Sequence, residues 1–253
     1  MRTRKILAAL ALASTVCTPL QAAEENVKLD HVEVNVTDTA SLQSGARTFV
    51  NYCLNCHSAS LVRYDQLRAI GLSDKQITDN LMFTAEKIGD PMNVAFNKKE
   101  AKAAFGVVPP DLSVIARSRS PDWLYTYLRG FYRDPSTVTG WNNTVYPNVA
   151  MPHVLWSLQG ERELVHVPVM RDGKQVEDHG KPKMDAKLQT VSKGSLSPTE
   201  YDRTVRDLVN FLVWIGEPHQ VKRQQIGVWV VIALVFLIAL TFALKNAYWK
   251  DVH

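Results

Sequence analysis

Residues 53–57 read Cys53-Leu54-Asn55-Cys56-His57, the C-x-x-C-H pattern at which haem c is attached to proteins. Each cysteine forms a thioether with a haem vinyl group, and the adjacent histidine binds the iron from one face. A thioredoxin-like redox pair does not need the histidine, and a zinc site needs two further ligands at short spacing. The pattern occurs once, so the sequence predicts a single haem held by Cys53 and Cys56, with His57 as an iron ligand.

The residue on the other face of the iron decides the chemistry of such a site. A sixth ligand favours electron transfer, whereas an open position favours oxygen or peroxide chemistry. Met151 lies in a loop stiffened by Pro147 and Pro152, which suits a ligand that must reach the iron without a helix of its own. The residue pattern favours Met151 and leaves Met92 and His153 as rivals.

Residues 1–22 have the pattern of a secretory signal peptide. Basic residues at positions 2, 4 and 5 precede a short alanine-rich apolar run, which is too short for a first transmembrane helix. Cleavage removes Cys17, the third cysteine of the chain. Because haem consumes the other two, the mature protein is expected to have neither a free thiol nor a disulfide.

Residues 226–244 form an uncharged apolar run of 19 residues, long enough to cross a bilayer as a helix. Trp229 lies near one end, and Tyr248 and Trp249 follow the other, as in an aromatic belt. A buried core helix is the alternative, but such a helix rarely lacks a polar face. We therefore expect an anchor in contact with lipid.

The two ends together predict a topology in the bacterial inner membrane. Residues 23–225 form a c-type cytochrome domain on the periplasmic side, residues 226–244 the anchor, and residues 245–253 a cytoplasmic tail. That tail is too short for the signalling domain that a membrane-anchored haem sensor would need.

Composition narrows the class further. The chain has 253 residues, of which 46% are apolar and 21% charged, and these values exclude collagen and wholesale disorder. The net charge of +4 belongs mainly to residues 1–22, which hold three of the 29 basic residues and none of the 25 acidic ones. The remainder has a charge of 26 − 25 = +1, with both signs interspersed, so nucleic acid is not an expected partner.

Apolar spacing predicts three helices, at residues 42–53, residues 121–129 and residues 198–215, the last opened by a capping box at Ser197. Alternating valines at positions 165, 167 and 169 before Asp172-Gly173 predict a small hairpin. We interpret the polar stretch 171–197 as a surface excursion.

Beyond the haem pattern the sequence resembles the cytochrome c1 family. The resemblance rests on four blocks: Val108-Pro109-Pro110-Asp111-Leu112-Ser113, Ile115-Ala116-Arg117-Ser118-Arg119, Tyr125-Thr126-Tyr127-Leu128-Arg129-Gly130-Phe131 and Phe211-Leu212-Val213-Trp214-Ile215-Gly216-Glu217-Pro218. It implies a mainly α, class I c-type cytochrome fold with a small hairpin excursion and one C-terminal transmembrane helix. It also implies that Met151 binds the iron, that Arg119 binds a haem propionate, and that Pro110 lines the haem pocket. His153 after Pro152 and the segment 165–196 depart from the family pattern.

The resemblance further implies a role in quinol:cytochrome c oxidoreductase, the bc1 complex of respiratory chains. The chain would take one electron from a Rieske iron–sulfur protein, beside cytochrome b in a dimeric complex, and pass it to a soluble or anchored cytochrome c. It would not be an enzyme on its own. The alternatives are a free-standing membrane-anchored shuttle, an oxidase haem subunit and, from another class, a haem peroxidase.

Overall fold

The computed structural model describes residues 27–94, 97–171, 174–178 and 181–250. The predicted signal peptide, residues 1–22, and the last three residues of the predicted tail lie outside the described residues. The helices are α2 (Thr39–Thr48), α3 (Asp74–Asn80), α4 (Lys98–Phe105), α5 (Ile115–Arg119), α6 (Pro121–Arg129), α7 (Trp156–Gln159), α8 (Pro198–Gly216) and α9 (Gln220–Tyr248), with a π-helical turn η1 (Phe49–Cys53) and a 3₁₀ helix η2 (Tyr64–Ile70). The strands are β1 (Ala59–Arg63), β2 (Pro91–Met92), β3 (Phe131–Arg133), β4 (Trp141–Asn143), β5 (Gly160–Pro168), β6 (Met170–Arg171), β7 (Lys174–Gln175), β8 (Glu177–Asp178), β9 (Lys181–Pro182) and β10 (Met184–Lys193).

The three predicted helices are present. α6 has the predicted bounds, and α8 begins with the predicted capping box, in which Ser197 and Glu200 bond each other's backbone N–H. The first helix, capped by Asp38, is regular only to Thr48 and then widens into the π-helical turn η1. Apolar spacing does not distinguish these two helix types, because the π-helical turn lasts only five residues.

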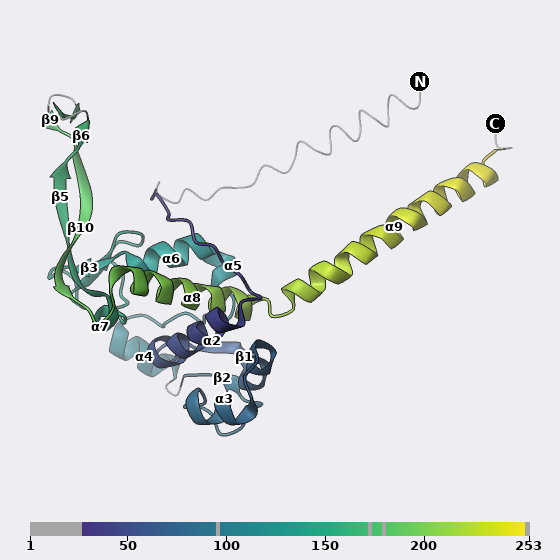
Figure 1. The fold of residues 1–253 in the computed structure, drawn as a ribbon, viewed down its shortest axis with the longest axis horizontal. Helices are drawn as coiled ribbons and strands as arrows, with labels where there is room; N and C mark the ends of the chain where they lie inside the picture. Colours follow the sequence, from purple (N-terminus) through teal and green to yellow (C-terminus); the bar gives the residue numbers. More distant parts are fainter. Residues whose placement is uncertain (1–26, 95–96, 172–173, 179–180, 251–253) are drawn as a thin grey trace.

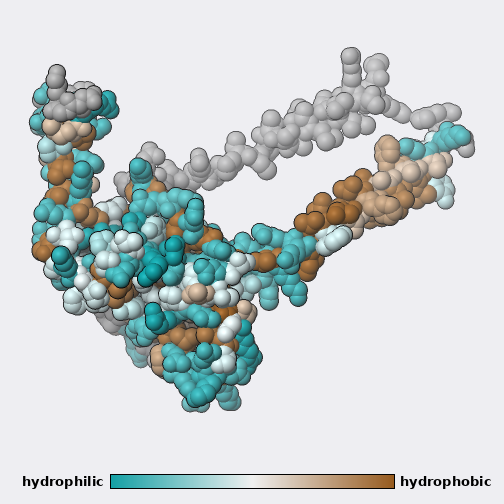
Figure 2. All heavy atoms as spheres, in the orientation of Figure 1, coloured by the Kyte–Doolittle hydropathy of each residue, from teal (hydrophilic) through white to brown (hydrophobic). Residues whose placement is uncertain are grey.

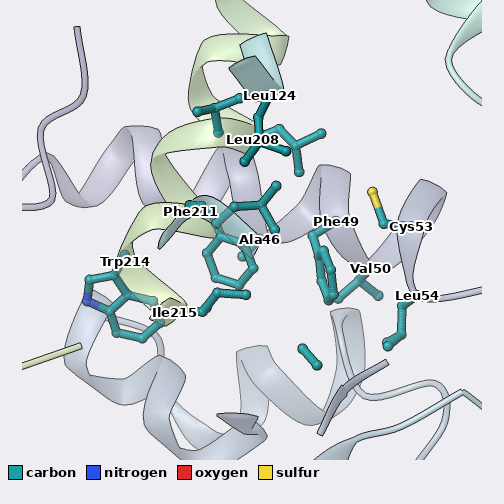
Figure 3. Packing of buried hydrophobic residues seen from close by; sticks show 14 of the residues in the cluster. Ala46, Phe49, Val50, Cys53, Leu54, Leu124, Leu208, Phe211, Trp214 and Ile215 are labelled. Atoms are coloured by element: carbon teal, nitrogen blue, oxygen red, sulfur yellow. The ribbon is translucent and has the colours of Figure 1, made fainter. Parts of the chain in front are cut away.

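The centre of the core is the crossing of α2 and α8 (Figure 3). Gly45 permits the approach, since a Cβ atom there would lie 2.1 Å from the Asp207 carbonyl oxygen and 2.6 Å from the Phe211 Cβ. Phe211 in turn packs on Phe49, with ring centroids 5.6 Å apart. This contact places the end of η1, and so Cys53, in the apolar interior.

Four strands form a sheet of order β10-β5-β3-β4. Two of them, β5 and β10, continue beyond the sheet as a long two-stranded arm that extends away from the helices (Figure 1). The alternating valines lie in a strand, as predicted, but Val165 and Val167 pair with Lys187 and Asp185 of the distant strand β10. The segment 171–197 belongs largely to this exposed arm, in line with the expected surface excursion. The predicted turn residues, Asp172 and Gly173, lie outside the described residues, and the strands on either side of them, β6 and β7, pair with each other. Both faces of β10 are largely solvated, so its sequence lacks the apolar alternation that identifies a half-buried strand.

α9 contains the predicted anchor, residues 226–244, and extends beyond it at both ends. It is long and apolar enough to cross a membrane, and none of its side chains is buried against the protein. Figure 2 shows it as a mostly apolar rod leaving a mixed surface. Arg223 forms an ion pair with Glu217 of the link from α8.

Candidate haem site

His57 follows η1 and is 9% exposed. Its Nδ1–H donates to the Pro110 carbonyl oxygen across 2.8 Å, which leaves Nε2 with no hydrogen-bond partner in the described part of the chain. Burial lowers the pKa of His57, although the Pro110 bond and the nearby Asp111 carboxylate act in the opposite direction. The imidazole is therefore held neutral and oriented, as an iron-binding histidine must be.

Cys53 is buried and Cys56 half-buried, and neither forms a disulfide. The backbone N–H groups of Cys56 and His57 both donate to the Cys53 carbonyl oxygen, across 3.0 and 2.9 Å. This tight turn brings the two thiols and the imidazole together. Burial, with a smaller effect from Cys56, raises the pKa of Cys53 to about 12, so that thiol keeps its proton.

The Pro-Pro-Asp-Leu-Ser block clamps the strand that follows His57. The three cross-links are Leu112 N–H to Ser58 O (2.8 Å), Ser60 N–H to Asp111 Oδ2 (2.9 Å) and Leu61 N–H to Ser113 Oγ (3.0 Å). They hold Pro110 in register, so that its carbonyl oxygen meets the imidazole. The sequence predicted Pro110 as a pocket-lining residue, and the structure adds this backbone contact.

Met151 is half-buried beside the hydrophobic core. Its Sδ accepts a hydrogen bond from the Tyr127 hydroxyl across 3.4 Å. Burial raises the pKa of Tyr127, so its hydroxyl remains a donor. Sequence reasoning assigned Tyr127 no role at the site, although it lies in the helix predicted at residues 121–129 and in one of the four family blocks. A tyrosine among the apolar residues of a helix, whose hydroxyl needs a partner, was the signal that could have identified it.

Arg119 ends α5 and is exposed. Its guanidinium lies 5.2 Å from the centroid of the Trp123 ring, and Trp123 stacks on Tyr127 with centroids 4.8 Å apart. These contacts connect Arg119 to Met151 through two aromatic rings. An exposed cation at the end of α5 suits an anionic group such as a propionate.

The two rival ligands have packing roles. Met92 is fully buried in β2, opposite Ala59. His153 is 2% exposed and stacks on Phe131, and burial lowers its pKa to about 4, with smaller opposing and reinforcing contributions from its neighbours.

The contacts divide the predicted residues into two groups, and the hydrophobic core includes Cys53 and Tyr127 and has Met151 packed against it. One group is His57 with Pro110, and the other is Arg119 and Met151 with their aromatic bridge. In the described residues no three His, Cys, Asp or Glu side chains gather as a bare metal site would require. Two thiols, one free imidazole nitrogen and a thioether fit an iron porphyrin instead.

Comparison with known proteins decides between families that share the C-x-x-C-H pattern. The model described as "Cytochrome C1 family" matches residues 31–252. The chain belongs to the cytochrome c1 family. It is therefore a c-type cytochrome, an electron carrier of the bc1 complex that uses a c-type haem.

Relatives of the cytochrome c1 family align over nearly the whole chain. A cytochrome c1 from Allochromatium vinosum is 44% identical over 237 residues, which cover 93% of this chain and 94% of that protein. A Nitrosomonas europaea protein named ammonia monooxygenase gamma subunit is 46% identical over 229 residues, covering 90% and 91%. A chain of a hyperthermophilic respiratory Complex III aligns over 99% of both chains at 16% identity, with a TM-score of 0.43.

Proposed function

We propose that the chain binds one haem covalently through Cys53 and Cys56, with His57 and Met151 on the two faces of the iron. In this state it accepts one electron from a Rieske iron–sulfur protein and passes it to a cytochrome c, within a dimeric complex that contains cytochrome b. The observation that carries the proposal is the His57 imidazole. One nitrogen donates to the Pro110 carbonyl, and within the described residues the other has no hydrogen-bond partner and the two neighbouring thiols form no disulfide.

The residues around this site would set the reduction potential. When bound, haem supplies a one-electron couple. The thioether of Met151 would favour the ferrous state, and the hydrogen bond from the Tyr127 hydroxyl would withdraw electron density from that sulfur. The Pro110 carbonyl makes His57 a stronger donor and fixes its ring, and Arg119 would bind a propionate at the exposed end of α5. No bond is made or broken on this chain, so it is not an enzyme apart from its complex.

The proposed topology places residues 23–225 in the bacterial periplasm after cleavage behind Ala22. Residues 226–244 cross the inner membrane, and residues 245–253 remain in the cytoplasm. The unburied apolar surface of α9 supports the anchor. Attachment of haem needs Cys53 and Cys56 as free thiols, and once Cys17 is removed no third cysteine is left to pair with either of them in a disulfide.

Purification in mild detergent through a tag on the C-terminus tests this function. We expect cytochrome b and an iron–sulfur protein to co-purify, and a quinol to reduce the c-type haem. A chain that purifies alone would be a free-standing shuttle, and one recovered with a terminal oxidase would be an oxidase subunit. Recovery with a monooxygenase would instead favour the function named for the Nitrosomonas protein. Rapid binding of carbon monoxide to the untreated protein would indicate the open site of a peroxidase.

A further inference from the structure

His153 lies two residues beyond Met151, and its imidazole is held between two aromatic rings. It stacks on Phe131 with centroids 4.9 Å apart and planes within 4° of parallel. The Trp141 ring meets it edge-on, with centroids 5.2 Å apart and planes at 79°. Its Nε2 is buried and has no hydrogen-bond partner among the described residues. Ring packing, together with a polar contact from Gln159, holds this side chain in place.

The ring on which His153 stacks belongs to the same segment that holds the Met151 sulfur. Tyr127 and Phe131 are four residues apart and pack edge to face, with centroids 5.1 Å apart. Tyr127, at the end of α6, donates its hydroxyl to Met151 Sδ. Phe131, at the start of β3, contacts His153. One segment therefore holds both the ligand side chain and the loop just beyond it.

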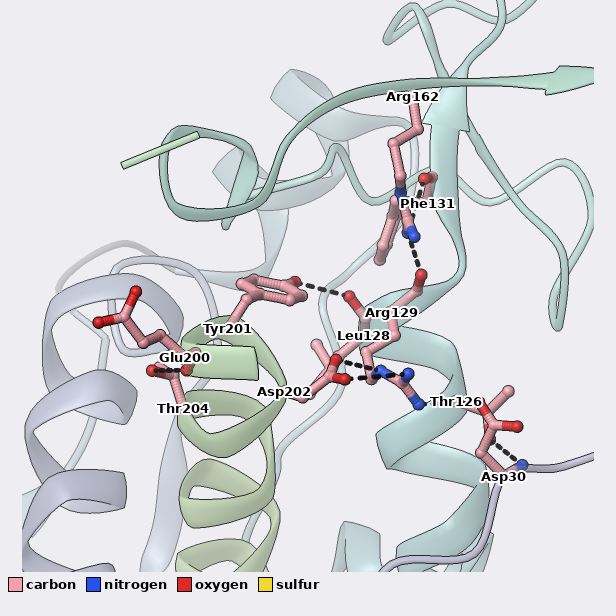
Figure 4. A network of polar contacts seen from close by, with 10 residues as sticks. All are labelled: Asp30, Thr126, Leu128, Arg129, Phe131, Arg162, Glu200, Tyr201, Asp202 and Thr204. Atoms are coloured by element: carbon pink, nitrogen blue, oxygen red, sulfur yellow. Dashed lines mark hydrogen bonds and ion pairs between the residues drawn. The ribbon is translucent and has the colours of Figure 1, made fainter. Parts of the chain in front are cut away.

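This supporting segment is itself fixed from outside the loop. The Phe131 carbonyl oxygen accepts a hydrogen bond from Arg162 across 3.2 Å (Figure 4). Phe131 also pairs with Asn143 of β4. Arg162 also donates to the Arg129 carbonyl at the end of α6, and Tyr201 donates to the Leu128 carbonyl across 2.9 Å. The segment that supports His153, residues 127–131, cannot shift without breaking several of these bonds.

We propose that His153 is a positioning residue for the sulfur ligand. Its ring, clamped by Phe131 and Trp141, fixes the loop so that the Met151 thioether stays within bonding distance of the iron. This inference rests on the proposed function, because it takes Met151 to be an iron ligand. In this proposal His153 does not bind the iron; its packing positions the residue that does.

Three variants of the full-length, membrane-purified protein test the inference. His153→Ala removes the clamped ring, and His153→Phe keeps a flat ring that can stack while removing the unpaired nitrogen. Leu155→Ala is the matched control, because Leu155 is as buried as His153 and belongs to the hydrophobic core that includes Phe131. The measurements are the sulfur–iron charge-transfer band of the oxidised protein, the rate of carbon monoxide binding to the reduced protein, and the melting temperature.

We expect His153→Ala to lose most of the band and to bind carbon monoxide at least tenfold faster, while His153→Phe keeps both wild-type values. Leu155→Ala should lower the melting temperature with the band intact. The inference is wrong if His153→Ala keeps the band, or if Leu155→Ala loses it to the same extent at equal destabilisation. It is also wrong if His153→Phe loses the band as His153→Ala does. Met151→Leu distinguishes failure of this inference from failure of the proposed function. If the band survives this change, Met151 is not the ligand and the proposed function itself is contradicted.

Discussion

At the scale of single residues, the proposed ligand Met151 is the residue that would distinguish an electron carrier from a haem protein with an open site. Met151→Leu keeps the apolar volume but removes the sulfur, so the charge-transfer band should vanish and the reduction potential should fall. A spectrum of the oxidised protein and a redox titration measure both. Met92→Leu is the control, because that buried side chain lies in β2, paired with Ala59 of β1, and should affect neither reading. Loss of the band in the control alone would identify Met92 as the ligand.

Tyr127 should tune the potential rather than create the site. Tyr127→Phe removes the hydroxyl that donates to Met151 Sδ but keeps the ring that stacks on Trp123. A hydrogen bond worth about 1 kcal/mol that favours the ferrous state would lower the potential by roughly 40 mV when lost. A redox titration measures the shift, with Tyr125→Phe as the control. An unchanged potential would show that the bond does not form once the sulfur binds iron.

Some residues of the candidate site can be recognised from the sequence and others cannot. Cys53, Cys56 and His57 are adjacent in the chain, so spacing alone identifies them. Met151 needs the family resemblance, because a proline-flanked methionine is only suggestive. Tyr127 and the Pro110 carbonyl act through contacts between segments distant in sequence, and no local pattern encodes such contacts.

At the scale of elements, the α2–α8 crossing should be the most sensitive point of the fold. Gly45→Ala places a methyl group 2.1 Å from the Asp207 carbonyl oxygen, so the two helices must separate. We expect a loss of about 1–3 kcal/mol in the free energy of unfolding, from overpacking. Denaturant titration followed by circular dichroism measures it. Gly89→Ala is the matched control, because a Cβ there has no atom within 4 Å. Equal stability of the two variants would contradict the close crossing.

The elements that could be predicted are those whose ends carry local chemistry. The α8 boundary is set by the Ser197–Glu200 capping box, and the α6 start by Pro121 after Ser120. The partner of β5 could not be predicted, since β10 pairs with it across the intervening tip and is exposed on both faces. Such pairing depends on how two distant segments align with each other, and neither segment alone shows it.

At the scale of the whole molecule, the haem domain and α9 should be separable. None of the side chains of α9 is buried against the domain. A chain that ends after Gln225 keeps the Glu217–Arg223 ion pair and exposes no core. We expect this truncated protein to be exported, soluble without detergent and unchanged in its haem spectrum. Fractionation of cells and a spectrum of the soluble fraction measure this, and aggregation or an altered spectrum would contradict it.

The central claim, one covalent haem on a processed chain, can be tested by the intact mass of the full-length protein after denaturation, with its free thiols counted. The account predicts the mass of residues 23–253 plus one haem, with no thiol that reacts with an alkylating reagent. Heat and acid should not remove the added mass, because two thioether bonds hold it. A mass without haem, together with two reactive thiols at Cys53 and Cys56, would contradict the account.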